Sequence, residues 1–178
     1  RRVLFRSDIK MKDCLGREWQ MGTVQVDFQL PLRFNLSYID SNGEKKTPIL
    51  VHRAIFGSFE RLIGIITEHF AGAFPVWLSP VQVSILPISD SQKEYAEKVK
   101  ALLEEKGIRV ELDARQEKIG YKIREAQLQK VPYMLILGEK EVEANAVGVR
   151  KRKEGDIGQM PVEEFISMIS KEIETKAL

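Results

Sequence analysis

A segment in the first half of the chain carries residues suited to binding phosphate. It reads HRAIFGSFER, from His52 to Arg61. Ser58 is a good N-cap, so we expect a helix to begin there with Arg61 in its first turn. A guanidinium offers a rigid fork of donors to phosphate oxygens, and the positive end of a helix attracts the same oxygens. Gly57 would let the backbone come close to a ligand. For an isolated arginine, a solvated position on the helix is the more common case.

A strand of alternating polarity precedes this segment. In Gly22–Leu30 (GTVQVDFQL) every second residue is apolar, which is typical of a half-buried strand with one polar face. Thr23 and Gln25 are two residues apart, so both point to one face and can meet the same ligand. Gln20 lies just before them. An ordinary polar sheet face is the alternative interpretation.

Composition sets limits on the class of protein. The chain has 178 residues, 43% of them hydrophobic, which is enough for one large domain or two small ones. Charged residues nearly cancel to +2, so binding to nucleic acid would require a local basic patch. The single cysteine, Cys14, excludes an internal disulfide and fits a reducing compartment, and we expect it to be buried. No apolar run is long enough to span a membrane.

The elements around the phosphate-binding segment are expected to form an antiparallel sheet. Leu36–Ile39 is a short strand candidate, the turn residues Asp40–Gly43 follow it, and Pro48–His52 is the next strand candidate. The helix that begins at Ser58 is expected to end at Gly72.

The second half of the chain has a different pattern, and two prolines in residues 74–80 (FPVWLSP) indicate a linker before it. Strands and amphipathic helices alternate beyond the linker, which predicts a mixed, mostly parallel sheet with helices on its faces. The expected strands are Val81–Ile88, Ile108–Leu112, Tyr133–Leu137 and Ala146–Arg150, and the expected helices are one capped by Asp90, one within Ile119–Lys130 and one opened by Pro161.

The first seven residues, RRVLFRS, do not fit either pattern. We expect residues 1–7 to be a non-native leader ahead of a segment that starts near Asp8.

Two stretches of the first half resemble a known family. HRAIFGSFER is similar to the third signature motif of the class II aminoacyl-tRNA synthetases in its threonyl form, and WQMGTVQVDFQL is similar to the strand beneath the adenosine in that family. The resemblance implies that residues 8–73 are the C-terminal part of a catalytic domain. It also implies that Arg61 is catalytic and lies against the triphosphate of ATP, which binds with Mg²⁺. The implied ATP and substrate contacts are Gln20, Thr23, Gln25, Ser58 and Arg61.

The same resemblance implies a specific role for His52, as a zinc ligand. In threonyl enzymes the matching histidine is one of three protein ligands of a Zn²⁺ ion that holds the substrate threonine. Neutral imidazole is a good zinc ligand, although a lone histidine at a strand end is more often structural. Neither His69 nor Cys14 matches a ligand position, so the other two ligands would precede residue 8.

The second half, residues 81–178, resembles the anticodon-binding domain that threonyl, prolyl, histidyl and glycyl synthetases share. The resemblance rests on DARQEKIGYKI at 113–123, VPYMLILG at 131–138 and VGVRKR at 147–152. It implies anticodon contacts from Gln116, Arg124, Lys130, Glu141 and Arg150. Glutamate can accept from a base amino group, while arginine and lysine can bind phosphate or a guanine edge. Lys151, Arg152 and Lys153 are candidates for nonspecific phosphate contacts.

The expected fold class is therefore α/β, with the end of a class II antiparallel sheet followed by an anticodon-binding domain. The resemblance implies part of a threonine–tRNA ligase that acts on ATP, threonine and tRNA(Thr) in the cytoplasm, as a homodimer when intact and without a membrane. The chain alone is expected to be inactive. The alternative is a noncatalytic RNA-binding module built on the same domain, which would need neither a nucleotide floor nor His52.

Overall fold

The computed structural model describes residues 5–178, and the chain divides into two compact units. The first unit ends at Phe70 and the second runs from Ala71 to Leu178. Residues 1–4 of the expected leader lie outside the described part of the chain. No helix within the described part is long and apolar enough to cross a membrane.

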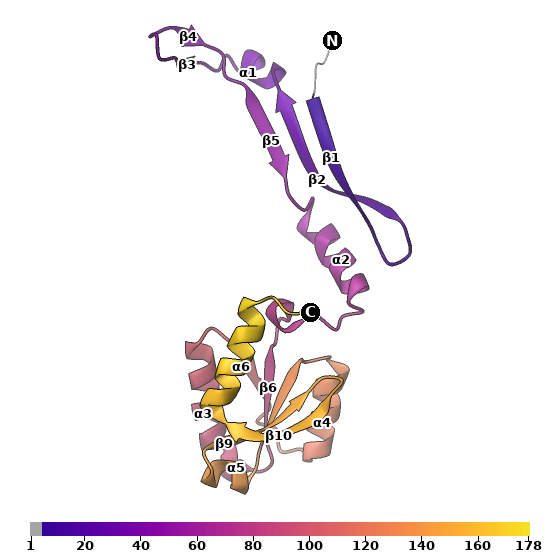
Figure 1. Cartoon of the computed structure of the whole chain (residues 1–178), viewed down its shortest axis with the longest axis vertical. Coiled ribbons are helices and arrows are strands. Elements are labelled where there is room, and N and C mark those ends of the chain that lie inside the picture. Colours follow the sequence, from indigo (N-terminus) through magenta and orange to yellow (C-terminus); the bar gives the residue numbers. More distant parts are fainter. Residues whose placement is uncertain (1–4) are drawn as a thin grey trace. The chain divides into compact units, whose positions relative to one another are not determined.

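The first unit contains a three-stranded antiparallel sheet in the order β1-β2-β5 (Figure 1). Its strands are β1 (Phe5–Lys12), β2 (Glu18–Asp27) and β5 (Leu50–Ala54). The expected antiparallel sheet is thus confirmed. Strand β1 includes residues 5–7 of the segment that we expected to be a leader.

Strand β2 ends earlier than the alternating pattern predicted. The chain turns after Asp27 into a short helix, α1 (Gln29–Arg33), so Leu30 is helical rather than extended. The cause is the carboxylate of Asp27, whose Oδ1 accepts from the backbone N–H groups of Gln29 at 2.8 Å and Leu30 at 3.1 Å. A carboxylate that satisfies the first free amides of a helix favours a turn over a continued strand.

Of the remaining elements of the first unit, β4 was not predicted, and the others differ from the expectations in extent. Strand β3 (Tyr38–Ile39) pairs with β4 (Lys45–Lys46) across the expected turn. The long helix, α2 (Phe59–His69), is capped by Ser58, whose hydroxyl accepts from the N–H of Arg61 at 3.3 Å. This helix ends three residues before Gly72.

The expectation that Cys14 is buried was wrong. Cys14 is exposed in the hairpin between β1 and β2, next to Asp13. The carboxylate of Asp13 organises this turn by accepting from the N–H groups of Leu15 and Arg17, so the turn residues point into solvent.

The second unit contains a five-stranded mixed sheet in the order β10-β9-β8-β6-β7. The three strands β7, β6 and β8 are parallel, whereas β8, β9 and β10 pair antiparallel. The strands are β6 (Val83–Pro87), β7 (Val110–Leu112), β8 (Tyr133–Leu137), β9 (Ala146–Lys151) and β10 (Gly155–Pro161).

Helices cover the two faces of this sheet unequally (Figure 1). Helices α3 (Lys93–Glu105) and α6 (Val162–Glu174) enclose the main core on one face, where Phe165 is fully buried. Helix α4 (Ile119–Leu128) packs on the other face and forms a smaller cluster around Leu86 and Met134. One face of the sheet is therefore closed, and the α4 face is only partly covered.

Three features of the second unit differ from the expectations. Helix α3 is preceded by a 3₁₀ turn (Asp90–Gln92), and its cap is a capping box of Ser89 and Gln92 rather than Asp90. The short helix α5 (Glu139–Glu143) and strand β10 were not predicted.

Candidate functional site

Strand β2 has a polar face in the first unit, and a β-bulge extends it. Ile9 pairs with Gly22 and Lys10 pairs with Gln20, so Met21 is the extra residue. A bulge shifts the alternation by one position, which turns Gln20 to the side of Thr23 although the two are three residues apart. The amide of Gln20 accordingly donates to Thr23 Oγ1 and to Asp8 Oδ1, at 2.7 Å in each case. The hydroxyl of Thr23 donates to the same carboxylate oxygen at 2.7 Å.

The same face continues to His52 on strand β5. Gln25 and His52 are direct cross-strand partners, so their side chains lie on one side of the sheet. The Nε2 atom of His52 lies 3.3 Å from Asp27 Oδ2. Backbone hydrogen bonds from Leu30 and Gln29, followed by the contact with His52, hold the pKa of Asp27 below its ordinary value of 3.8. The structure thus brings Gln20, Thr23, Gln25 and His52 together on one polar face.

Arg61 lies at the Gln20 end of this face. Its Nη1 donates to the backbone oxygen of Gln20 at 3.2 Å, and its guanidinium carbon lies 5.9 Å from the centre of the Trp19 ring, within range of a cation–π interaction. Ser58 caps the helix that carries Arg61 but makes no closer approach to the polar face. The two contacts of Arg61 fix its side chain against β2.

Gly57 has a structural role in the turn before α2. Its φ is +71°, and a Cβ at this position would lie 3.4 Å from the backbone oxygen of Met21 and 3.7 Å from that of Gln20. These distances are ordinary van der Waals contacts, so the left-handed backbone of the turn, and not a lack of space, is what favours glycine here.

The described residues do not form a zinc site by themselves. Within residues 5–178 there is no group of three His, Cys, Asp or Glu side chains that could hold a metal ion. His52 is half-exposed, and Asp27 is the acidic group beside it. One imidazole is too small a ligand set for a structural or catalytic zinc site.

Two of the five positions expected to read RNA, Glu141 and Arg150, lie on the open face of the sheet in the second unit. Glu141 on α5 accepts from the backbone N–H of Gly138 through Oε2 at 2.9 Å, and its Oε1 would lie 3.7 Å from a Cβ on Gly148. Arg150 follows two residues after Gly148 on β9 and so lies on the same face. A carboxylate oxygen of Glu141 and the guanidinium of Arg150 therefore border this face, whereas Arg124 points to solvent from α4.

The side chain of Arg150 is unusual because part of it is buried without a partner. Its Nε has no hydrogen-bond partner within the described chain. The residue lines a cavity of about 330 Å³ beside α4, together with Gln127, Met134 and Lys153. A buried donor of this kind is costly unless a ligand or water satisfies it. Arg150 is thus available to an acceptor that enters the cavity.

The other two expected RNA contacts lie elsewhere. Gln116 follows β7 and donates to Asp90 Oδ2 at 2.7 Å, near the carboxyl ends of the parallel strands. Lys130 lies before the start of β8, and its Nζ donates to the backbone oxygen of Ala71. The structure does not bring Lys130 together with Glu141, because β8 separates them along its length.

A model of the anticodon binding domain matches residues 82–172, just over half of the chain. The chain belongs to the anticodon-binding domain family. A model of the class II tRNA synthetase core domain (G, H, P, S and T) matches residues 5–70, so the first unit is a segment of a class II core.

Proteins similar over most of the chain are threonine–tRNA ligases. Those of Clostridium tetani (strain Massachusetts / E88) and Clostridium novyi (strain NT) are 62% and 60% identical over 169 residues, 95% of this chain. The chain spans about a quarter of the length of these relatives. The RNA-binding domain of threonyl-tRNA synthetase from Cryptosporidium parvum Iowa II is 40% identical, with a TM-score of 0.82 over 93% of this chain and 42% of that one.

A more distant structure supports the fold. Prolyl-tRNA synthetase from Cryptosporidium parvum, complexed with L-proline and AMP, is 24% identical to this chain, with a TM-score of 0.71. The match covers 96% of this chain and 37% of the prolyl-tRNA synthetase chain. The arrangement of a core segment followed by an anticodon-binding domain is therefore common to both synthetases.

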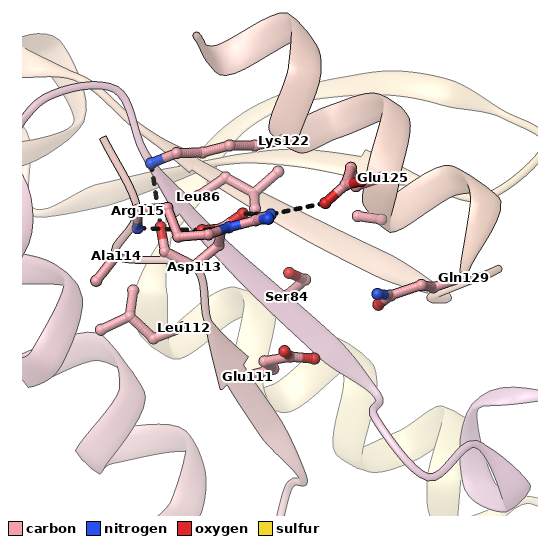
Figure 2. Close-up of a pocket in the computed structure, with 11 residues that line it drawn as sticks. Ser84, Leu86, Glu111, Leu112, Asp113, Ala114, Arg115, Lys122, Glu125 and Gln129 are labelled. Carbon is pink, nitrogen blue, oxygen red and sulfur yellow. Dashed lines mark hydrogen bonds and ion pairs between the residues drawn. The ribbon is translucent and has the colours of Figure 1, made fainter. Parts of the chain in front are cut away.

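The anticodon-binding domain contains a buried lysine that the sequence did not reveal. Lys122 on α4 is only 3% exposed, and its Nζ donates to the backbone oxygens of Pro87 at 3.0 Å and Asp113 at 3.1 Å. Figure 2 shows Lys122 at one end of a cavity of about 380 Å³, in which Arg115 bridges Asp113 and Glu125. These contacts fix the start of the loop that carries Gln116.

The class II segment also contains positioning residues that were missed. The indole N–H of Trp19 donates to Asp13 Oδ2 at 2.8 Å, and Arg17 joins Asp13 to Glu68 on α2. Desolvation opposes ionisation of Asp13, but hydrogen bonds from Trp19 and Arg17 outweigh it and lower the pKa to about 2. This ionised carboxylate holds the ring on which Arg61 rests. No sequence motif marks it, because an aspartate in a turn usually serves the turn alone.

Proposed function

We propose that the chain is the C-terminal part of an enzyme that joins threonine to tRNA(Thr). In the first step a carboxylate oxygen of threonine attacks the α-phosphorus of ATP, and pyrophosphate leaves. In the second step the terminal 3′ hydroxyl of the tRNA attacks the acyl carbon, and AMP leaves. The anticodon-binding domain holds the other end of the same tRNA.

The observation that carries this proposal is the position of Arg61 beside the polar face of β2. Arg61 is held by Gln20 and Trp19 at one end of a row of side chains that can contact a nucleotide. An arginine fixed in advance stabilises charge on the transferring phosphate without reorganisation. Thr23 and Gln25 form the floor beneath the nucleotide in this proposal. The similarity to threonine–tRNA ligases over 95% of the chain supports threonine as the amino acid.

His52 is proposed as one ligand of a Zn²⁺ ion in the intact protein, where the ion would hold the amino and hydroxyl groups of threonine. The other two ligands would come from sequence before residue 8. Mg²⁺ would accompany ATP, and the intact protein would act as a cytoplasmic homodimer. Because this chain supplies one ligand and one side of the nucleotide site, we propose that it is inactive alone.

The test is threonine-dependent exchange of pyrophosphate into ATP by the intact protein. We expect Arg61→Ala to slow exchange by about 10²–10³, the usual effect of removing one donor that stabilises transition-state charge. Arg61→Lys should fall between Ala and the wild type, since it keeps the charge and loses the planar fork. Circular dichroism should show that α2 is intact, because Ser58 caps it through the backbone of residue 61.

Near-normal pyrophosphate exchange by Arg61→Ala would mean that Arg61 is a solvated helix residue without a catalytic role. If the intact wild type binds tRNA(Thr) but never activates threonine, the noncatalytic RNA-binding module is the correct alternative.

A further inference from the structure

The segment that leads into the anticodon-binding domain is held by two basic side chains, Lys130 and Arg152, that come much later in that domain's sequence. The backbone oxygen of Ala71 accepts from Lys130 Nζ. The backbone oxygens of Ala73 and Phe74 accept from Arg152 Nη2, at 3.0 and 2.6 Å. Side-chain donors thus satisfy three carbonyl groups of residues 71–74, although these residues belong to no helix or strand.

Arg152 connects two segments because its guanidinium is planar and forked. While Nη2 binds residues 73 and 74, Nη1 donates to the backbone oxygen of Lys130. Its own backbone N–H donates to Pro132 at 2.8 Å, which fixes the start of the side chain. Burial lowers the pKa of the guanidinium, but arginine remains charged at any relevant pH. Most of its donors are therefore used within the protein and are not free to bind phosphate.

The same residue also borders the cavity in which Arg150 lies. Arg150, Arg152 and Lys153 line this cavity of about 330 Å³ together with Gln127. Lys153 is exposed and makes no hydrogen bond or ion pair within the described chain. Neighbouring basic residues thus differ in role, since Lys153 faces solvent and Arg152 is bound to the lead-in segment.

We propose that Arg152, assisted by Lys130, is a positioning residue that fixes the direction in which residues 71–74 leave the anticodon-binding domain. The inference rests on the proposed function: a tRNA bound at its anticodon must reach a catalytic centre with its other end. A fixed lead-in segment restricts the orientations that the bound RNA can take, and restriction of this kind raises the rate of transfer rather than of threonine activation.

The first test uses hydrogen exchange of this chain. Arg152→Gln removes the fork, and Lys153→Gln removes the same charge from the adjacent residue. The N–H groups of Leu78 and Ser79 donate to Pro75 and Val76, so their amide exchange reports local opening of this segment. We expect Arg152→Gln to speed that exchange about tenfold or more, since the charge-assisted hydrogen bonds to residues 73 and 74 are lost. Lys153→Gln should leave that exchange unchanged. Lys130→Gln, which breaks only the contact with Ala71, should have a smaller effect on the same amides.

The second test uses the intact protein. We expect Arg152→Gln to lower kcat for threonyl transfer to tRNA(Thr) about tenfold, with pyrophosphate exchange unchanged and binding of an anticodon stem-loop within about twofold. Lys153→Gln should weaken binding of the stem-loop and lower the salt dependence of that binding. It should not slow threonyl transfer at saturating tRNA. Arg152→Lys should restore transfer only in part, because one ammonium cannot bridge both segments.

Two results would overturn the proposal. Equal effects of Arg152→Gln and Lys153→Gln on stem-loop binding, with transfer at saturating tRNA unchanged, would make Arg152 a phosphate contact. Unchanged exchange of the Leu78 and Ser79 amides would show that the fork does not hold the segment. If the wild-type intact protein transfers no threonine, the proposed function fails and the role in transfer fails with it, whereas the hydrogen-exchange result still reports on the contacts themselves.

Discussion

Lys122 offers the sharpest test of how the anticodon-binding domain holds its loops. The ammonium donates to the carbonyl groups of Pro87 and Asp113, at the carboxyl ends of the parallel strands β6 and β7. No carboxylate pairs with it directly. We consider the substitution Lys122→Met, which keeps most of the buried stem and removes the charge and both donors.

The expected loss of stability follows from two opposing effects. Each hydrogen bond from a charged donor contributes about 1.5–3 kcal/mol net, and its removal leaves a buried carbonyl oxygen without a donor. Methionine, in turn, avoids the cost of burying an ammonium. Lys122 also lines two cavities of about 380 Å³ each, and water can enter from them to bind the freed oxygens. We therefore expect a net loss of about 2 kcal/mol, or about 10 °C in Tm for a domain of this size.

The measurement is thermal and urea unfolding of the second unit, with Lys118→Met as the control. Lys118 is an exposed lysine four residues earlier that makes no side-chain hydrogen bond or ion pair among residues 5–178, so its substitution should leave the Tm within about 1 °C. A Lys122→Met variant as stable as the wild type would refute the reasoning. It would mean that the desolvation cost of the ammonium equals what its two hydrogen bonds contribute.

Three further predictions concern the sites and the domain boundary. Glu141→Gln and Arg150→Gln should each weaken binding of a cognate threonine anticodon stem-loop by about 1–3 kcal/mol, and binding of a loop with altered anticodon bases much less. Lys153→Gln should weaken binding of both loops equally. Binding titrations at two salt concentrations distinguish these outcomes. His52→Ala in the intact protein should abolish stoichiometric zinc by metal analysis together with threonine activation, while the fold survives. Deleting residues 71–80 from the second unit should lower its stability to urea by about 3 kcal/mol, since the core loses a buried valine and several buried hydrogen-bond partners; unchanged stability would show that these residues are only a linker.

Periodicity in the sequence predicted most helices and strands, and it failed where side chains override it. Strand β8 was predicted at Tyr133–Leu137 and occurs there, because five apolar residues in a row are suited to a strand buried on both faces. Strand β10 (GDIGQMP) was missed since it has two glycines at positive φ and a register shift near Asp156, which remove any alternation.

The polar face of β2 was predictable only in part. Two-residue spacing was enough to place Thr23 and Gln25 on one side. The position of Gln20 on the same side depends on the bulge at Met21, and nothing in the sequence distinguishes a bulged methionine from a paired one. Trp19 and Asp13 were missed for a related reason: their contacts join a hairpin turn to a helix that is distant in sequence. Such contacts follow from tertiary packing and not from local pattern.

The run Arg150–Lys153 shows most clearly what a charge pattern leaves open. The four residues have the same sign, and the last three were all expected to be phosphate contacts, yet each has different surroundings. Arg150 Nε is buried without a partner, and Lys151 pairs with Glu154 at 3.0 Å. Arg152 donates to backbone oxygens, while Lys153 is exposed. Where the chain leaves a strand and turns, each successive side chain enters a different environment. Neighbouring residues of equal charge therefore differ in how much energy it costs to bind a ligand through them. Of the four, Arg150 gains most from an acceptor in its cavity, and Arg152 would have to give up existing hydrogen bonds to bind one.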